Sequence, residues 1–125
     1  MRYLLDTHLL LWWMNNDPLL SAKVRQYVVN PDFDVAISAV NIWEIGTKHA
    51  LGRLDIPVNF IAGVLDYPFS KLEITFAHAW AASQLPFIHK DPFDRLLVAQ
   101  SQLESRILLT VDKLLLDYAP HIELA

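Results

Sequence analysis

The sequence predicts an α/β fold: a parallel sheet covered by helices on both faces, formed by a single domain over residues 1–125. Short runs of consecutive apolar residues alternate along the chain with longer segments whose apolar residues recur at helical spacing. Strands that are buried on both faces of a parallel sheet have such continuous apolar runs. Hydrophobic residues make up 54% of the 125 residues, which is enough for a core on each side of the sheet.

The first elements are a strand and two helices. The run Tyr3–Leu5 is expected to be a short buried strand. Thr7 is a suitable cap for a helix from His8 to about Met14, which the polar residues and the proline at 15–18 end. Ser21 is expected to cap a second helix, with Val24, Tyr27 and Val28 on its apolar face.

A second strand and two further helices follow. Val35–Ile37 is expected to be a strand, and Ser38 directly after it is a candidate N-cap. The next helix should run from Ala39 to about Leu51, with Gly52 as the residue that ends it. We expect another helix from Pro57 up to Pro68.

The last third of the chain repeats the alternation. Residues 72–74 are a candidate strand, and Thr75 is expected to cap a helix that ends near Pro86. Asp91 as N-cap and Pro92 as first helical residue are a favoured start for the next helix. Ile107–Thr110 is the most strand-like run near the C-terminus. A helical turn at 113–116 and an edge strand at 121–124 complete the prediction.

Composition excludes several classes of protein. The chain has no cysteine, which rules out disulfides, thiolate metal sites and cysteine nucleophiles. The net charge of −4 argues against nucleic-acid binding by bulk electrostatics alone. The apolar stretch from Leu9 to Met14 is too short to span a membrane and is followed by no small-residue cleavage site. We therefore expect a soluble, cytoplasmic protein with no membrane partner.

Four acidic residues stand beside predicted core elements, whereas the other acids fall in loops or on outer faces. Asp6 follows the first strand, and Asp112 follows the strand at 107–110 by one residue. Asp94 is in the first turn of a helix, and Glu44 lies on a narrow polar strip of a largely apolar one. In open parallel sheets, ligand sites lie beyond the carboxyl ends of the strands, so these acids are expected to converge there.

Each acid also has a purely structural explanation. Asp6 can cap the end of the strand before it, Asp112 can be the N-cap of the short helix after it, Asp94 can complement a helix dipole, and Glu44 can pair with Lys48 at i,i+4 spacing. If the four converge, however, mutual repulsion raises their pKa values. A hard divalent cation removes that cost, and a site made of oxygen ligands favours Mg²⁺ or Mn²⁺ over Zn²⁺.

The sequence resembles the PIN-domain ribonucleases, most closely the toxins of bacterial type II (VapBC-like) toxin–antitoxin pairs. The resemblance extends over almost the whole chain. It rests on an ordered set of motifs: Leu5-Asp6-Thr7-His8, Ile37-Ser38-Ala39-Val40, Ile42-Trp43-Glu44-Ile45, Leu51-Gly52-Arg53-Leu54, His89 to Gln100, and Leu109-Thr110-Val111-Asp112.

The resemblance implies a PIN-like three-layer sandwich and metal-dependent endonuclease action on single-stranded or loop RNA. Carried over by position, Asp6, Glu44 and Asp94 match the three core metal-site acids of the family, and Asp112 matches the more variable fourth. Thr110 and Ser38 match hydroxyl residues that support the acids through hydrogen bonds. The expected cofactor is Mg²⁺ or Mn²⁺, which lowers the pKa of a bound water and clamps the phosphate.

Partners follow from the same resemblance. RNA phosphates are expected to contact basic residues that flank the acidic segments: Lys48, Arg53, Lys90, Arg95 and Lys113. Each of these can equally be a solubilising charge or part of a local ion pair. His8 and His89 are near the acids in sequence, but neither is needed if a metal generates the nucleophile. The tryptophans at 12, 13, 43 and 80 are interpreted as core or interface residues.

The apolar faces of the helices around 42–51 and 58–67 exceed what one core needs. With the resemblance, they predict a homodimer and a cognate antitoxin that covers the groove.

Three alternative functions stay open at this point. A phosphoryl-transfer or receiver domain would carry paired acids after the first strand, whereas Asp6 is followed by Thr7 and His8. A PIN-like binding scaffold without catalysis would gain no stability from metal. A PIN nuclease that acts in RNA processing would be separated from a toxin only by its gene neighbourhood or by growth arrest on expression. The RNA target, the number of metals and the antitoxin are not encoded in any motif.

Overall fold

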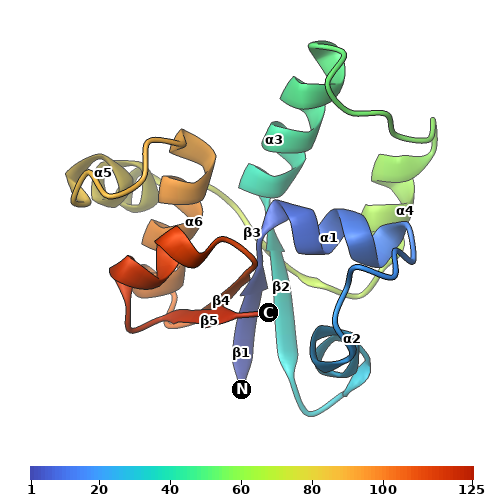
Figure 1. Cartoon of the computed structure of the whole chain (residues 1–125), viewed down its shortest axis with the longest axis horizontal. Coiled ribbons are helices and arrows are strands. Elements are labelled where there is room, and N and C mark those ends of the chain that lie inside the picture. Colours follow the sequence, from blue (N-terminus) through green and yellow to red (C-terminus); the bar gives the residue numbers. More distant parts are fainter.

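The computed structural model describes residues 1–125 and has a five-stranded parallel sheet at its centre (Figure 1). The strand order is β3-β2-β1-β4-β5 and every neighbouring pair is parallel. The strands are β1 (Arg2–Leu5), β2 (Asp34–Ser38), β3 (Ser70–Leu72), β4 (Ile107–Thr110) and β5 (Ile122–Leu124). The chain thus starts at the centre, moves outward through β2 and β3, and returns to the other side of β1 at β4. Such a switch point between β1 and β4 is where open α/β sheets bind ligands.

Helices cover both faces of the sheet, as predicted. On one face are α1 (Thr7–Met14), α2 (Ala22–Val29) and α4 (Phe60–Asp66). On the other are α5 (Phe76–Gln84), α6 (Pro92–Leu103) and the 3₁₀ helix η1 (Lys113–Tyr118). The helix α3 (Ala39–Ala50) contacts both α1 and α6 and stands above the carboxyl ends of the strands (Figure 1).

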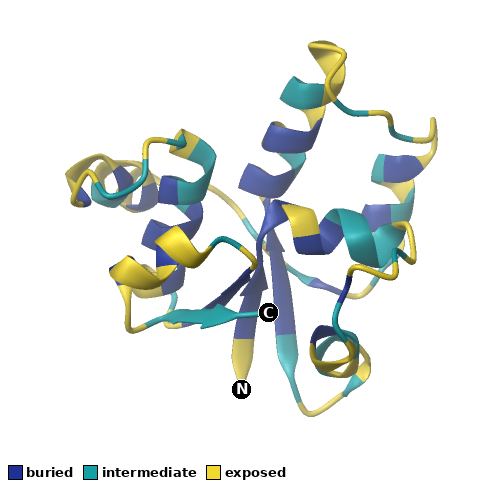
Figure 2. Cartoon of the chain, viewed as in Figure 1, coloured by how far each residue is buried: buried dark blue, intermediate teal, exposed yellow.

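The side chains of each strand alternate between two hydrophobic cores. Tyr3 and Leu5 of β1 pack into the core under α1, α2 and α4. Leu4, between them, packs into the core under α5 and α6. Figure 2 shows the consequence: the central strands are buried along most of their length, and most exposed residues lie on outer helix faces and in loops. None of the helices combines the length and apolarity needed to cross a membrane.

Several predicted element boundaries are wrong. Asp6 rather than Thr7 caps α1, because the Asp6 carboxylate accepts a hydrogen bond from the Leu9 N–H. The third strand covers 70–72 instead of 72–74. It pairs with β2 only as far as Leu72, opposite the last residue of β2, so the residues beyond have no partner strand. The fourth helix begins at Phe60, three residues after Pro57.

Candidate metal centre

The four acids singled out from the sequence all come from the carboxyl side of the sheet. Asp6 follows β1 and Asp112 follows β4, the two strands that flank the switch point. Glu44 projects from α3, and Asp94 lies in the first turn of α6. The negative charges of Glu44 and Asp6 add, after burial and the charge of Asp91, to the raised pKa of Asp94.

Asp6 is 3% exposed and is held by hydrogen bonds on both carboxylate oxygens. Oδ1 accepts the Leu9 N–H at 2.9 Å. Oδ2 accepts the Thr110 hydroxyl at 2.7 Å and the Val111 N–H at 3.3 Å. Asp6 therefore caps α1 and also ties the end of β1 to the end of β4.

Glu44 is equally buried and has two partners. The Thr7 hydroxyl donates to Oε1 at 2.5 Å, and the Lys48 ammonium lies 2.6 Å from Oε2. Burial disfavours the charged ammonium, but the Glu44 carboxylate outweighs it, and the pKa of Lys48 is raised. The Lys48 pairing expected from i,i+4 spacing is therefore formed, and it lies at the acid cluster.

Asp94 and Asp112 meet at a histidine. His89 Nε2 lies 2.8 Å from Asp112 Oδ2 and 3.3 Å from Asp94 Oδ2. One ligand atom from each of the three residues lies within 4.8 Å of the others. Asp6 and Glu44 are not part of this tightest group, and their oxygens are engaged by Thr110, Thr7 and Lys48.

Burial and crowding shift the pKa values of two of the acids upward. Burial raises the pKa of Asp6 above its usual value, against the hydrogen bonds that it accepts. Burial also raises the pKa of Asp94, to about 7, and the negative charges of Asp91 and Glu44 add to the effect. Positive charge placed among these carboxylates would relieve both penalties.

The comparison with known families bears on this arrangement. The sequence profile of the PIN domain family matches residues 3–119. The chain belongs to the PIN domain family. PIN domains are nucleases, so the acidic site of this chain lies in a fold that cleaves nucleic acids. No curated protein sequence matches the chain.

Solved structures share the fold of this PIN domain at low sequence identity. VapBC2 from Rickettsia felis, bound to a DNA fragment from its promoter, superposes with a TM-score of 0.71 at 14% identity, covering 100% of this chain and 98% of the other. A toxin–antitoxin complex from Klebsiella pneumoniae has a TM-score of 0.69 at 19% identity, covering 97% of this chain and 95% of the other. FitAcB from Neisseria gonorrhoeae has a TM-score of 0.64 at 18% identity, covering 99% of this chain and 96% of the other. The common feature is a complete PIN fold.

The residues present in this PIN domain suit a divalent cation. The donor set is dominated by carboxylate oxygens, which are the ligands of hard divalent ions. Two of the acids have raised pKa values, as expected for carboxylates that lack a neutralising charge. Asp6, Glu44, Asp94 and Asp112 are the candidate ligands, and of these Asp94 and Asp112 offer ligand atoms that lie, with one from His89, within 4.8 Å of one another.

The two hydroxyl residues expected to support the acids behave differently. Thr110 donates its hydroxyl to Asp6 and also accepts the Asp112 N–H at 3.0 Å, so it connects two acids of the site. The Ser38 hydroxyl accepts the Val40 N–H and caps α3, but it makes no hydrogen bond to an acid. Ser38 therefore sets where α3 begins, and through it the position of Glu44.

The five basic residues expected to contact RNA fall into three groups. Lys48 and Arg53 line one polar cavity beside the acids. Lys90 and Lys113 are exposed and form no ion pair. Arg95 is buried and donates to the main-chain oxygens of residues 82, 85, 86 and 89 and to the Tyr118 hydroxyl. Its donors are therefore used inside the fold, and we correct the expectation that Arg95 contacts phosphate.

Two residues of the centre were missed or undervalued in the sequence. The sequence gives no need for His89 in catalysis, yet in the structure its side chain contacts two of the acids. Its place three residues before the Pro92 start of α6, at the same edge as Asp94, was the available signal. Asn41 is fully buried, and its side chain donates to Leu5 O and the Thr7 hydroxyl. A polar residue one turn before Glu44 on an apolar helix pointed to it.

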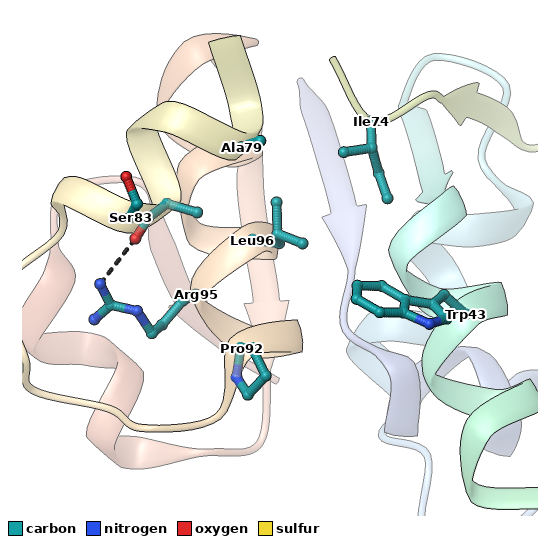
Figure 3. A pocket seen from close by; sticks show the side chains of 8 residues that line it. Trp43, Ile74, Ala79, Ser83, Pro92, Arg95 and Leu96 are labelled. Atoms are coloured by element: carbon teal, nitrogen blue, oxygen red, sulfur yellow. Dashed lines mark hydrogen bonds between the residues drawn. The ribbon is translucent and has the colours of Figure 1, made fainter. Parts of the chain in front are cut away.

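A separate apolar pocket of about 400 Å³ lies between α3 and the pair α5 and α6, and none of the four acids lines it. Figure 3 shows Trp43 and Ile74 on one side and Ala79, Leu96 and Pro92 on the other. The hydrogen bond drawn there joins the Arg95 guanidinium to the Ala82 carbonyl. The pocket belongs to the exposed apolar surface of the domain and not to the acidic centre.

Proposed function

We propose that this PIN domain is a Mg²⁺- or Mn²⁺-dependent endoribonuclease that cleaves single-stranded or loop RNA, and that it is the toxin of a toxin–antitoxin pair. The observation that supports it most directly is the gathering of Asp6, Glu44, Asp94 and Asp112 at the switch point of the sheet. A divalent cation bound there supplies a water of lowered pKa and stabilises the charge that develops on the phosphate.

The side chains of the chain itself position the reactants. Thr110 and the Leu9 N–H fix both oxygens of Asp6, so the carboxylate cannot rotate away from the site. Thr7 and Lys48 do the same for Glu44. His89 holds Asp94 and Asp112 together on the opposite side. A carboxylate held in this way is suited to orient a water for attack on phosphorus.

The proposed partners rest on the relatives and on the exposed surface. The Klebsiella pneumoniae structure that shares the fold is a toxin–antitoxin complex, which supports an antitoxin for this chain. Trp43 of α3 and Leu65 of α4 are about half exposed, at 53% and 51%. Large apolar side chains left in water are typical of an interface, and we propose a homodimer through α3 and α4.

The test is cleavage of an unstructured single-stranded RNA by the purified, partner-free protein, with and without Mn²⁺ or Mg²⁺. The Asp6→Asn variant keeps a residue that can cap α1 but removes the charge, so we expect cleavage to fall by at least about 100-fold. Asp66→Asn, at an exposed position of α4, is the matched control and should cleave normally.

The same experiment separates the alternatives. Cleavage that requires metal and is lost only in the Asp6 variant supports the nuclease. If Mn²⁺ raises the melting temperature without cleavage, the enzyme needs a narrower RNA target, which growth arrest on expression would then reveal for a toxin. If Mn²⁺ neither stabilises nor activates the protein, a binding scaffold replaces the nuclease as the better explanation.

A further inference from the structure

A polar cavity of about 500 Å³ opens between α1 and the C-terminal end of α3. It is the size of the pockets that hold small ligands. Its lining includes His8 and Trp12 from α1, and Lys48 and Arg53 from the end of α3 and the turn after it. Leu9 and Leu10 of α1 are buried in the core, and neither of them lines this cavity.

The cavity shares residues with the acidic centre. Thr7 lines it and donates its hydroxyl to Glu44 at 2.5 Å. Lys48 lines it and lies 2.6 Å from the other oxygen of Glu44. A polymer that places one phosphate at the acids would therefore place an adjacent unit at this cavity.

The cavity offers aromatic surface at its α1 wall. Trp12 packs against the core on one side and lines the cavity on another. The exposed His8 ring lies beside it, with ring centroids 6.1 Å apart. Aromatic side chains next to a basic groove are what single-stranded nucleic acid binds, because every base has a face that stacks.

The cavity also offers polar groups that have no partner within the protein. Neither the Arg53 guanidinium nor the Asn15 side-chain amide makes a hydrogen bond or an ion pair. Asp17, the one acid in the lining, already accepts the Leu19 N–H. A free guanidinium suits a phosphate, and a free amide suits the edge of a base.

We propose that this cavity binds one nucleotide of the RNA next to the scissile phosphate, with the base on Trp12 and the flanking phosphate on Arg53. The inference rests on the ribonuclease function proposed above and adds the place where the substrate sequence is read. Two cations, an aromatic wall and an unpaired amide fit a nucleotide better than they fit an apolar segment of a protein. The tryptophan interpreted from the sequence as a core or interface residue thus also contacts substrate.

The test compares the Mn²⁺-dependent cleavage kinetics of Arg53→Gln, Trp12→Ala and Trp12→Phe with wild type. For Arg53→Gln we expect KM to rise with kcat nearly unchanged, and the slope of log KM against log salt to fall by about 0.7 as one phosphate contact is lost. For Trp12→Ala we expect KM to rise by roughly tenfold, with substantial recovery in Trp12→Phe because phenylalanine still stacks. Arg2→Gln removes the same charge at the opposite, amino edge of the sheet and should match wild type.

A stability measurement and two variants at exposed positions guard against loss of folding in the variants. Stabilisation by Mn²⁺ should be equal in all variants, since none removes an acid of the centre. If Trp12→Ala does not fold, the exposed Arg53→Gln and Asn15→Ala substitutions carry the test.

If these variants cleave RNA with the KM and the salt slope of wild type, the nucleotide pocket is refuted and the nuclease stands. The cavity would then be free to bind a protein partner instead. Absence of cleavage and of RNA binding in wild type would overturn both proposals.

Discussion

At the scale of single residues, the candidate metal centre depends on carboxylates that are costly to bury and on neighbours that fix them in place. Asp6 is almost fully buried, and Thr110 holds it through a hydrogen bond. Asp94 is less buried, but it lies in a field of other acids. The environment of Asp94 should affect the stability of the protein, and the hydrogen bond from Thr110 should affect its affinity for metal.

Replacement of Asp94 by Asn should stabilise the metal-free protein at neutral pH. Because the pKa of Asp94 rises from 3.8 to about 7 on folding, the native state retains a proton that the unfolded chain releases. Stability from this group is present below the lower value and is lost as the pH rises through the higher one. Above pH 7 we therefore expect the Asp94→Asn variant to melt higher than wild type by roughly 4 °C or more.

Thermal melts with chelator across this pH range provide the check. The two proteins should converge at acid pH, where Asp94 is protonated in both states, and the exposed control Asp66→Asn should show no such dependence. A difference between Asp94→Asn and wild type that does not vary with pH would contradict the raised pKa.

Thr110→Val tests the support of the acids. Valine keeps the shape of the buried side chain but loses the hydrogen bonds to Asp6 and from the Asp112 N–H. Loss of such a supporting contact lowers metal affinity by roughly 10- to 100-fold. Titration of Mn²⁺ by calorimetry measures it. Ser101→Ala, which removes a buried hydroxyl bonded within α6, should bind Mn²⁺ like wild type.

At the scale of elements, two helices carry the centre and each is anchored by a buried polar residue. Asn41 fastens α3 to the end of β1 through Leu5 O and Thr7. Arg95 fastens the segment between α5 and α6 to the body of α6. His89 lies in that segment, so the anchor also helps to determine where the histidine meets the acids.

Arg95→Met should destabilise the protein by about 2–4 kcal/mol, because several buried carbonyls lose their donor. Urea unfolding measures the loss, and hydrogen exchange should quicken in residues 82–89. Arg95→Lys keeps the charge but not the fork of donors, so it should be destabilised too. Full recovery of stability by the lysine variant would mean that charge, and not the hydrogen bonds, is what matters at this position.

At the scale of the whole molecule, the two hydrophobic cores leave several large apolar side chains outside. Trp43 and Leu65 lie on the helices proposed to form the dimer. Phe76 and Trp80 of α5 are exposed as well, and the sequence did not single out this helix as a dimer surface. The domain thus has more unpartnered apolar surface than an isolated fold requires.

Leu65→Lys should convert the proposed dimer into a monomer. A lysine ammonium at the centre of an apolar interface is left without water or a partner. Size-exclusion chromatography with light scattering gives the mass directly. Leu103→Lys is the matched control, since Leu103 of α6 is exposed to the same degree, 49% against 51% for Leu65, and lies outside the proposed interface. A wild-type monomer at high concentration would refute the dimer.

The sequence by itself determined the alternation of strands and helices, the cap at Asp91 and the edge of the sheet where the acids gather. Local rules are sufficient for these features, since apolar periodicity, capping and strand direction act within a few residues. Where contacts with neighbouring elements determine the structure, the prediction and the structure differ. Thr7, expected to cap a helix, instead donates a hydrogen bond to Glu44. The third strand lies at residues 70–72, where it can pair with β2.

Only the tertiary structure decided the roles of His89, Arg95 and Trp12. Each depends on contacts with residues far away in the chain: His89 with Asp112, and Arg95 with Ala82 and Tyr118. Trp12 lines a cavity with Lys48 and Arg53, which a helix wheel of α1 cannot reveal. A charged or aromatic residue is ambiguous in sequence because its role is set by burial and by partners, and both exist only once the chain has folded.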